Sequence, residues 1–372
     1  MTCRGRIQVS FRKACRLYGI VGLLLLPAAA KADWFVVNLN PSGSNLSAAV
    51  SVQGRRQVGI ALASGAYRAS LWSGSAGSWI NLHPTDAASS FAVGVDSGQQ
   101  VGYAYLGDEP HASLWSGSAA SWVDLNPAGA FQSEAYGVRN GQQVGNAVVD
   151  GIRRASLWTG TATSWVDLSP VGAIESAAYG TNGNQQVGFA SGNGFGGACL
   201  WSGTAASWVN LNPAGTNQSI AYDVDAGQQV GYAYVGAVPH ASLWSGTAAS
   251  WVDLNPAGSP TSQVYAVHQG QQAGYADVGN VRRASLWSGT PESWVDLHSF
   301  LPQQFAYSYA QGIWHGASGS TFVVGFGVTA GQTKALLWVL LGSTQTIIPT
   351  STSLGPASST LSVVRAAAGG LD

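Results

Sequence analysis

Residues 141–168, GQQVGNAVVDGIRRASLWTGTATSWVDL, reveal the fold because versions of this stretch recur along most of the chain. Short runs of alternating or β-branched residues are separated by turn dipeptides, and Asn140-Gly141 and Asp150-Gly151 are typical of type I′ hairpins. In this copy we predict four strands: Ala135–Val138, Gln143–Val149, Ala155–Trp158 and Ser164–Leu168. The unit is therefore a four-stranded antiparallel meander.

Three landmarks repeat with a period of 43 residues. A Leu-Trp pair ends at Trp72, Trp115, Trp158, Trp201, Trp244, Trp287 and Trp338. A second aromatic segment begins at Trp79, Trp122, Trp165, Trp208, Trp251 and Trp294, and a Gln-Val-Gly segment lies before each Leu-Trp pair. Only the last copy departs from the period, by eight extra residues. Seven such units predict an all-β, seven-bladed β-propeller, with an open β-repeat solenoid as the alternative.

The ends of the repeat array predict how the ring closes. Val36–Leu39 resembles the fourth strand of a unit without the other three, so it can complete the seventh blade. Gln345–Ile348 follows Trp338 where that fourth strand belongs, and the two segments compete for one place. We assign residues 33–349 to the propeller and residues 350–372, rich in Ser, Thr and Ala, to a disordered tail.

Residues 1–32 have the pattern of a secretory signal peptide. Basic residues from Arg4 to Arg16 precede an apolar run around Tyr18–Leu26, and Ala30-Lys31-Ala32 offers cleavage before Asp33. The apolar run is shorter than the ~20 residues that span a bilayer. We therefore expect a secreted or periplasmic bacterial protein without a stable membrane span after cleavage.

Composition narrows the classes of function. Without residues 1–32 the chain has 10 basic and 17 acidic residues, a net charge of −7, which argues against a nucleic-acid partner. Cys199 is the single cysteine that remains, so no intrachain disulfide forms. We predict no cofactor, no metal site and no catalytic residues. No His-x-x-x-His or Cys-x-x-Cys metal spacing occurs, the glutamates are isolated in the sequence, and spacing alone does not identify a pair of catalytic carboxylates.

The repeat resembles the HAF-type extracellular repeat of exported bacterial proteins. The resemblance rests on a basic residue and Ala before Leu-Trp, as in His111-Ala112-Ser113-Leu114-Trp115, followed by Gly141-Gln142-Gln143-Val144-Gly145. The same pattern recurs in His240–Trp244 and Gly270–Gly274, and it covers the chain from about Val36 to Trp338. The resemblance implies export and a propeller-like array.

Two repeated features are candidate binding residues. The tryptophans invite a lectin interpretation, but their regular spacing predicts that they form the cores of the blades. A basic row precedes the Leu-Trp strand: Arg68, His111, Arg154, His240, Arg283 and Lys334. Its alternatives are ion pairs between blades, with the recurring Asp124, Asp167, Asp253 and Asp296, or a ring of cations at a channel mouth that binds an acidic ligand.

Irregular residues supply the remaining candidates. Trp314 falls outside the register of the repeated tryptophans, and His315 lies beside it in the eight-residue insertion. We expect a monomeric, non-enzymatic protein that binds a carbohydrate or a cell-envelope component through variable loops on one face. A propeller enzyme acting on polysaccharides and a structural or protein-interaction module are the alternatives.

Overall fold

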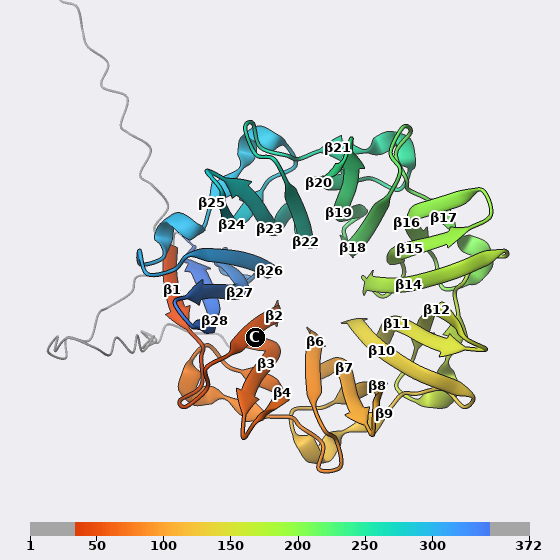
Figure 1. Ribbon diagram of the computed structural model, residues 1–372, viewed down its shortest axis with the longest axis horizontal. Coiled ribbons are helices and arrows are strands. Elements are labelled where there is room, and N and C mark those ends of the chain that lie inside the picture. The colour runs from red at the N-terminus through yellow and green to blue at the C-terminus, as the bar shows by residue number, and fades with distance from the viewer. Residues whose placement is uncertain (1–33, 343–372) are drawn as a thin grey trace, which may run out of the picture. The chain divides into compact units, whose positions relative to one another are not determined.

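The computed structural model describes residues 34–342. The predicted signal peptide (1–32), the second candidate closing strand Gln345–Ile348 and the predicted tail (350–372) lie outside the described residues. The described residues form seven four-stranded antiparallel sheets arranged in a ring, which confirms the seven-bladed propeller (Figure 1). No helix within residues 34–342 is both long and apolar enough to cross a membrane.

Each blade begins with an inner strand that borders the central channel (Figure 1). The inner strands of blades 1 to 7 are β2 (Ser47–Gln53), β6 (Ser90–Asp96), β10 (Ala130–Arg139), β14 (Ala173–Thr181), β18 (Ser219–Asp225), β22 (Ser262–His268) and β26 (Tyr307–His315). The second strands are β3 (Arg56–Ala63), β7 (Gln99–Leu106), β11 (Gln142–Val149), β15 (Gln186–Gly192), β19 (Gln228–Val235), β23 (Gln271–Val278) and β27 (Thr321–Thr329).

The third and fourth strands lead toward the rim of the ring. The third strands are β4 (Ala66–Trp72), β8 (Glu109–Trp115), β12 (Ile152–Trp158), β16 (Phe195–Trp201), β20 (Val238–Trp244), β24 (Val281–Trp287) and β28 (Gln332–Leu340). The fourth are β5 (Ile80–Asn81), β9 (Val123–Asp124), β13 (Val166–Asp167), β17 (Val209–Asn210), β21 (Val252–Asp253), β25 (Val295–Asp296) and, in blade 7, β1 (Trp34–Asn38).

Short 3-10 helices explain why the fourth strand is shorter than predicted. Six of them directly precede a fourth strand: η1 (Ala76–Ser78), η2 (Ala119–Ser121), η3 (Ala162–Ser164), η4 (Ala205–Ser207), η5 (Ala248–Ser250) and η6 (Pro291–Ser293). A further one, η7 (His298–Phe300), follows β25. In blade 3, η3 takes up Ser164, and the Trp165 indole N–H turns inward to donate to Ser156 Oγ at 2.8 Å. Only Val166 and Asp167 remain as β13.

The seams between blades form the core. The seven Leu-Trp indoles are completely buried, in hydrophobic clusters shared by neighbouring blades, which confirms their predicted role. A glycine of the Gln-Val-Gly segment is required in each blade because the inner strand bulges toward it. A Cβ on Gly145, for example, would lie 1.9 Å from the carbonyl oxygen of Glu134.

A serine bridges every seam. Ser176 Oγ of blade 4, for example, accepts from the Ala155 N–H of blade 3 at 2.8 Å, and the other seams repeat this bond. The ring-closing seam has it as well, since the Ala335 N–H of blade 7 donates to Ser47 Oγ of blade 1 at 2.9 Å. These bonds tie each blade to the next.

The chain closes the ring through its N-terminal strand. β1 pairs antiparallel with β28, from Trp34 opposite Leu340 to Asn38 opposite Leu336, and so completes blade 7. Leu39, which follows β1, is fully buried against blade 1. The predicted segment Val36–Leu39 therefore includes three residues of the closing strand and its buried anchor.

Candidate functional site in the central channel

The basic row lies on the third strands, two strands away from the channel. Four of its members pair with an aspartate of the fourth strand in their own blade: His111 with Asp124, Arg154 with Asp167, His240 with Asp253 and Arg283 with Asp296, at 2.7–2.9 Å. Arg68 donates to the Ala63 carbonyl at 3.3 Å, and Lys334 lies in β28 opposite Gly327. The pairs therefore form within blades rather than between them, and the row does not ring a channel mouth.

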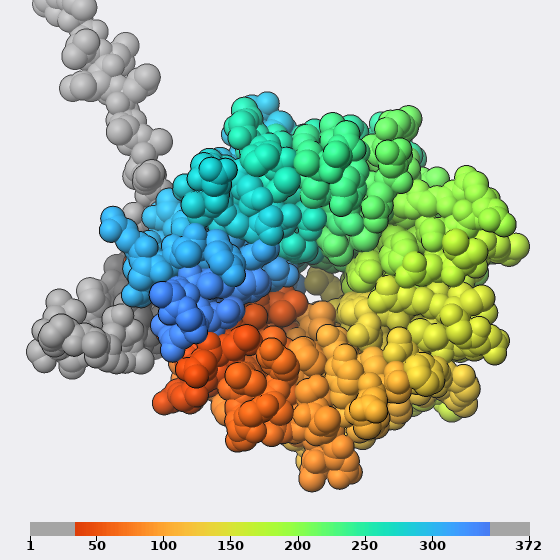
Figure 2. Space-filling view, in the orientation of Figure 1, coloured from red at the N-terminus to blue at the C-terminus, as the bar shows by residue number. Residues whose placement is uncertain are grey.

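All seven inner strands line a central lumen of about 340 Å³. Figure 2 shows the hollow at the middle of the ring. We call its two ends the hairpin end, at the turns between first and second strands, and the loop end, where the interblade loops enter the inner strands. The predicted variable-loop face is the face of the loop end.

Four successive blades place a tyrosine at the same position of the lumen wall. Neighbouring rings of Tyr136, Tyr179, Tyr222 and Tyr265 have centroids 5.2, 5.5 and 5.4 Å apart. The other three blades carry Val50, Val93 and Gln311 there, so the lumen has one aromatic side. Burial raises the pKa of each of the four phenols, which therefore present neutral hydroxyls.

A ring of dissimilar residues occupies the hairpin end. The matching repeat position at the end of the inner strand holds Gln53, Asp96, Arg139, Asn182, Asp225, His268 and Trp314 in blades 1 to 7. Asn182 directly follows β14, and Trp314 is the next-to-last residue of β26. This position changes from blade to blade whereas the Leu-Trp position does not. The sequence signal is a column five residues before the valine of Gln-Val-Gly in most copies, and sequence reasoning overlooked it.

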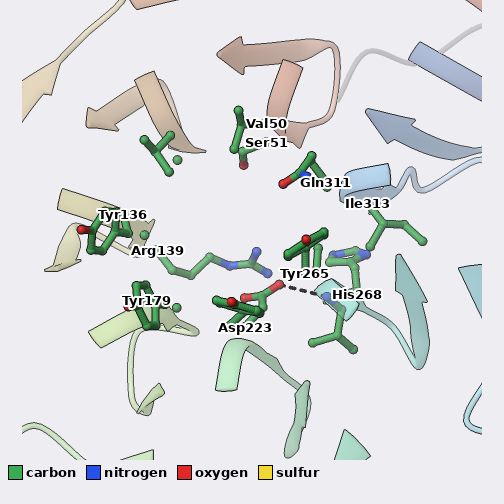
Figure 3. Close-up of a pocket in the computed structure, with 18 of the residues that line it drawn as sticks. Val50, Ser51, Tyr136, Arg139, Tyr179, Asp223, Tyr265, His268, Gln311 and Ile313 are labelled. Atoms are coloured by element: carbon green, nitrogen blue, oxygen red, sulfur yellow. Dashed lines mark hydrogen bonds between the residues drawn. The ribbon is translucent and has the colours of Figure 1, made fainter. Parts of the chain in front are cut away.

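Arg139 of this ring extends into the lumen, toward the blades that carry Asp223 and His268 (Figure 3). Its Nε lies 3.8 Å from Asp96 Oδ1 and its Nη2 lies 3.8 Å from Asp225 Oδ1, two blades away. Its guanidinium also lies 5.3 Å from the centroid of the Trp314 ring, within cation–π range. One side chain thus contacts three other blades and narrows the hairpin end.

Trp314 and His315 belong to β26 rather than to an insertion loop, which corrects the predicted position of His315. The extra residues of the last repeat are divided, with three before β26 and five in the turn after it. The Trp314 ring lies 4.1 Å from the ring of His268, and the His315 N–H donates to His268 Nδ1 at 3.1 Å. Burial lowers the pKa of His268 to about 4 and also lowers that of His315, so both are neutral at pH 7.

Asp223 is a residue of the lumen wall that interrupts the sevenfold repetition of the inner strands. Four other blades have glycine at its position: Gly94, Gly137, Gly180 and Gly312. The Asp223 carboxylate accepts from the Val267 N–H of the next blade at 3.0 Å and from the Val224 N–H at 2.8 Å. Burial against blade 6 outweighs these bonds and raises the pKa of Asp223 to about 7.

Cys199 is buried and accepts the Trp208 indole N–H at 2.9 Å. Burial raises the pKa of its thiol to about 12, which leaves the unreactive thiol form at neutral pH. Within residues 34–342, no three His, Cys, Asp or Glu side chains gather as a metal site would require.

Comparison with known proteins identifies likeness at the level of fold. No protein-family model matches the sequence, and no curated protein sequence matches it either. The structure aligns with puromycin hydrolase at a TM-score of 0.52 and 13% identity, over 80% of this chain and 54% of that one. The chain therefore spans about half the length of that enzyme.

Two shorter proteins are matched over nearly their whole length. The propeller domain of the Trilobed protease from Pyrococcus furiosus aligns at a TM-score of 0.51 and 11% identity, over 84% of this chain and 100% of that one. Oligogalacturonate lyase in complex with manganese aligns at 0.52 and 9% identity, over 84% and 99%. At these identities the likeness establishes one conclusion, that the chain is a β-propeller.

Proposed function

We propose that this protein is an exported propeller that binds a carbohydrate of the cell envelope without altering it chemically. The observation that carries the proposal is the aromatic side of the lumen, where Tyr136, Tyr179, Tyr222 and Tyr265 form a continuous arc. Their rings offer apolar contact and the hydroxyls of Tyr179, Tyr222 and Tyr265 offer hydrogen bonds, and a sugar ring needs both. The Tyr136 hydroxyl is already bonded to Glu134 and Asn146. The interblade loops, which vary between repeats, provide further contacts at the loop end.

Two carboxylates near the lumen, Asp96 and Asp225, are already engaged by other groups of the ring, which disfavours a catalytic role for them. Asp96 accepts from the Gln53 side chain at 2.5 Å and from the Asn140 N–H at 3.0 Å. Asp225 accepts from the Gln269 N–H at 2.9 Å and lies beside Arg139. A catalytic acid or base must instead reach a proton of the substrate.

A glycan array probed with protein that begins at Asp33 tests the proposal. The matched variant replaces Tyr179 and Tyr222 by valine, the residue at this position in blades 1 and 2. We expect binding of at least one glycan and a loss of about tenfold or more in affinity in the variant. Absence of binding to any glycan, with a specific protein recovered in a pull-down, would instead support a protein-interaction module.

A polysaccharide-cleaving enzyme is the second candidate, and Asp223 favours it. A carboxyl with a pKa of about 7 beside a lumen is typical of catalytic acids and bases. Puromycin hydrolase and oligogalacturonate lyase, which have a similar fold, are enzymes by name. New reducing ends from a polysaccharide, lost in Asp223→Gly, would establish this activity and overturn the binding proposal.

Export by the signal peptide and membership of the HAF-type repeat family complete the proposal. The basic and apolar pattern of residues 1–32 supports export, and the repeated basic-Ala-x-Leu-Trp pattern supports the family. N-terminal sequencing of the protein from the periplasm or medium tests export. We expect the sequence to begin at Asp33, and a protein that stays in the cytoplasm with residues 1–32 would contradict it.

A further inference from the structure

Two arginines at the same repeat position have unlike surroundings. Arg153 in blade 3 and Arg282 in blade 6 each precede a member of the basic row, and their side chains lie on the opposite face of the strand, toward the next blade. Arg282 is held by short bonds: Nε and Nη2 donate to Asp277 at 2.8 and 2.9 Å, and Nη1 donates to Tyr309 Oη at 2.7 Å. Three of the five N–H donors of its guanidinium are therefore held by short bonds.

Arg153 lacks such a partner because Val148 stands where blade 6 has Asp277. Its Nη1 reaches Glu175 of blade 4 at 3.4 Å, and its Nη2 lies 3.5 Å from Tyr136 Oη and 3.8 Å from Glu134. The Arg153 side chain is 34% exposed and that of Glu175 is 46% exposed. The donors of Arg153 are therefore held only by longer contacts than those of Arg282, while the two side chains are equally exposed, at 34%.

Apolar side chains are exposed at the start of the same two inner strands. β10 and β14 each carry an additional bulge at this end, and its extra residues, Phe131 and Ile174, are 64% and 63% exposed. Repeats 1, 2 and 5 have Asn45, Ala88 and Asn217 at this position. Ile174 adjoins Glu175 in sequence, and Phe131 lies three residues before Glu134. Blades 3 and 4 thus expose an aromatic and an aliphatic side chain on the same two strands that carry Glu134 and Glu175.

We infer that Phe131, Arg153, Glu175 and Glu134 form a subsite for a neutral, hydroxyl-rich saccharide at the loop end, between blades 3 and 4. The inference rests on the proposed carbohydrate binding and gives it a place and a ligand class. A sugar ring packs against Phe131, while the Arg153 donors and the Glu175 oxygens bond its adjacent hydroxyls. Tyr136 donates to Glu134 and also lines the lumen, so the subsite adjoins the tyrosine arc.

The charge of the cluster selects the ligand class. Arg153 contributes one positive charge and Glu134 and Glu175 two negative charges, so the cluster is net negative. The chain without residues 1–32 is also acidic. An acidic polysaccharide would be repelled, whereas neutral hydroxyls both donate to the carboxylates and accept from the guanidinium.

Calorimetric titration of the protein beginning at Asp33 tests the subsite, with maltohexaose, cellohexaose and xylohexaose as neutral probes and hexagalacturonate as the acidic probe. The variants Phe131→Ala, Arg153→Thr and Glu175→Gln take residues found at the same positions in other repeats, Ala88, Thr333 and Gln132. The control Arg282→Thr alters the engaged arginine instead. Thermal melting verifies that each variant is folded.

We expect one or more neutral hexasaccharides to bind, and each subsite variant to weaken that binding about tenfold or more. Arg282→Thr should leave the affinity within about twofold of the parent protein. If a neutral hexasaccharide binds and the subsite variants do not weaken its binding, the subsite does not lie between blades 3 and 4, and the proposed function remains intact. Binding of hexagalacturonate alone would overturn the ligand class, and no binding of any saccharide would overturn the inference together with the proposed function.

Discussion

Trp158 and Arg139 belong to the same blade, yet they represent two unlike regions of the molecule. The position of Trp158 holds tryptophan in all seven blades, and every copy is completely buried. The position of Arg139 holds six different residue types in seven blades, and Arg139, Asp225, His268 and Trp314 of this set line the lumen. Every seam joins two similar blades, so each blade needs the same buried tryptophan there. At the lumen all seven blades meet around one axis, so the residue at one position can differ from blade to blade. The repeated seams therefore stabilise the fold, and the inner strands carry the side chains that differ from blade to blade.

Removal of the closing strand should have the largest effect on stability, because it removes a whole strand from one seam. A chain that begins at Asn40 lacks β1 and the fully buried Leu39, although every other seam keeps its residues. We expect a loss of roughly 5 kcal/mol or more in the free energy of unfolding, because a buried leucine alone contributes ~2–5 kcal/mol. Urea denaturation measures it. An unchanged midpoint would show that β1 is not needed for closure.

Trp158→Ala should come next, with a loss of about 3–5 kcal/mol from the cavity in one seam. Urea denaturation measures the loss. Trp165→Ala, at a partly buried position, should be milder and serves as the control. Glycan affinity of the folded fraction should not change, because Trp158 is far from the lumen in the sheet order. Equal stability of parent and variant would contradict the core role of the tryptophan.

Asp223→Gly should change how stability depends on pH. The pKa of Asp223 is raised from an ordinary 3.8 to about 7, so the folded protein keeps a proton that the unfolded chain releases between these values. The stabilisation that this proton gives is present at low pH and is lost as the pH rises toward 7. The glycine variant has no such loss.

The stability of Asp223→Gly relative to the parent should therefore increase by roughly 1–3 kcal/mol between pH 4 and pH 8. Urea denaturation at the two pH values measures this difference. His268, whose pKa is lowered to about 4, acts in the opposite direction in both proteins and cancels in the comparison. A difference that does not vary with pH would mean that Asp223 is ionised throughout this range.

The smallest effect is expected at the rim. Asp167→Asn takes the residue that blades 1 and 4 have at this position, Asn81 and Asn210, and it removes the ion pair with Arg154. Both side chains of the pair are about 30% exposed or less, so we expect a loss of about 1 kcal/mol or less that decreases as salt is added. A larger, salt-independent loss would indicate a structural role beyond the ion pair.

Sequence periodicity predicted the number and order of the blades better than the first and last residues of their strands. In blade 3, the predicted Gln143–Val149 differs from β11 by one residue, whereas the predicted Ala135–Val138 became Ala130–Arg139. Two bulges interrupt the alternation of this inner strand, so the pattern that marks a strand is lost although its pairing continues. The fourth strand of blade 3 is shorter than predicted because η3 includes Ser164. The Trp165 indole bonds to Ser156 of the third strand instead of continuing the strand pairing.

The candidate site was less predictable than the fold. The basic row was visible in the sequence because it repeats, and four of its members proved to be paired with aspartates at the rim. Arg139 occurs once at its repeat position and Arg153 recurs only in blade 6, as Arg282, so neither stands out as a repeated landmark. The contact between Arg139 and Asp225 joins residues 86 positions apart, and no local pattern encodes it.

By itself, the sequence determined the period, the number of blades, the burial of the tryptophans and the candidate N-terminal closing segment. These follow from local preferences repeated at a constant spacing, so one copy explains the others. Only the tertiary structure decided which side chains meet at the lumen and which of the two arginines, Arg153 or Arg282, is held by short bonds. Such contacts depend on closure of the ring, which brings unlike residues of different blades to one axis and leaves no trace in any single repeat.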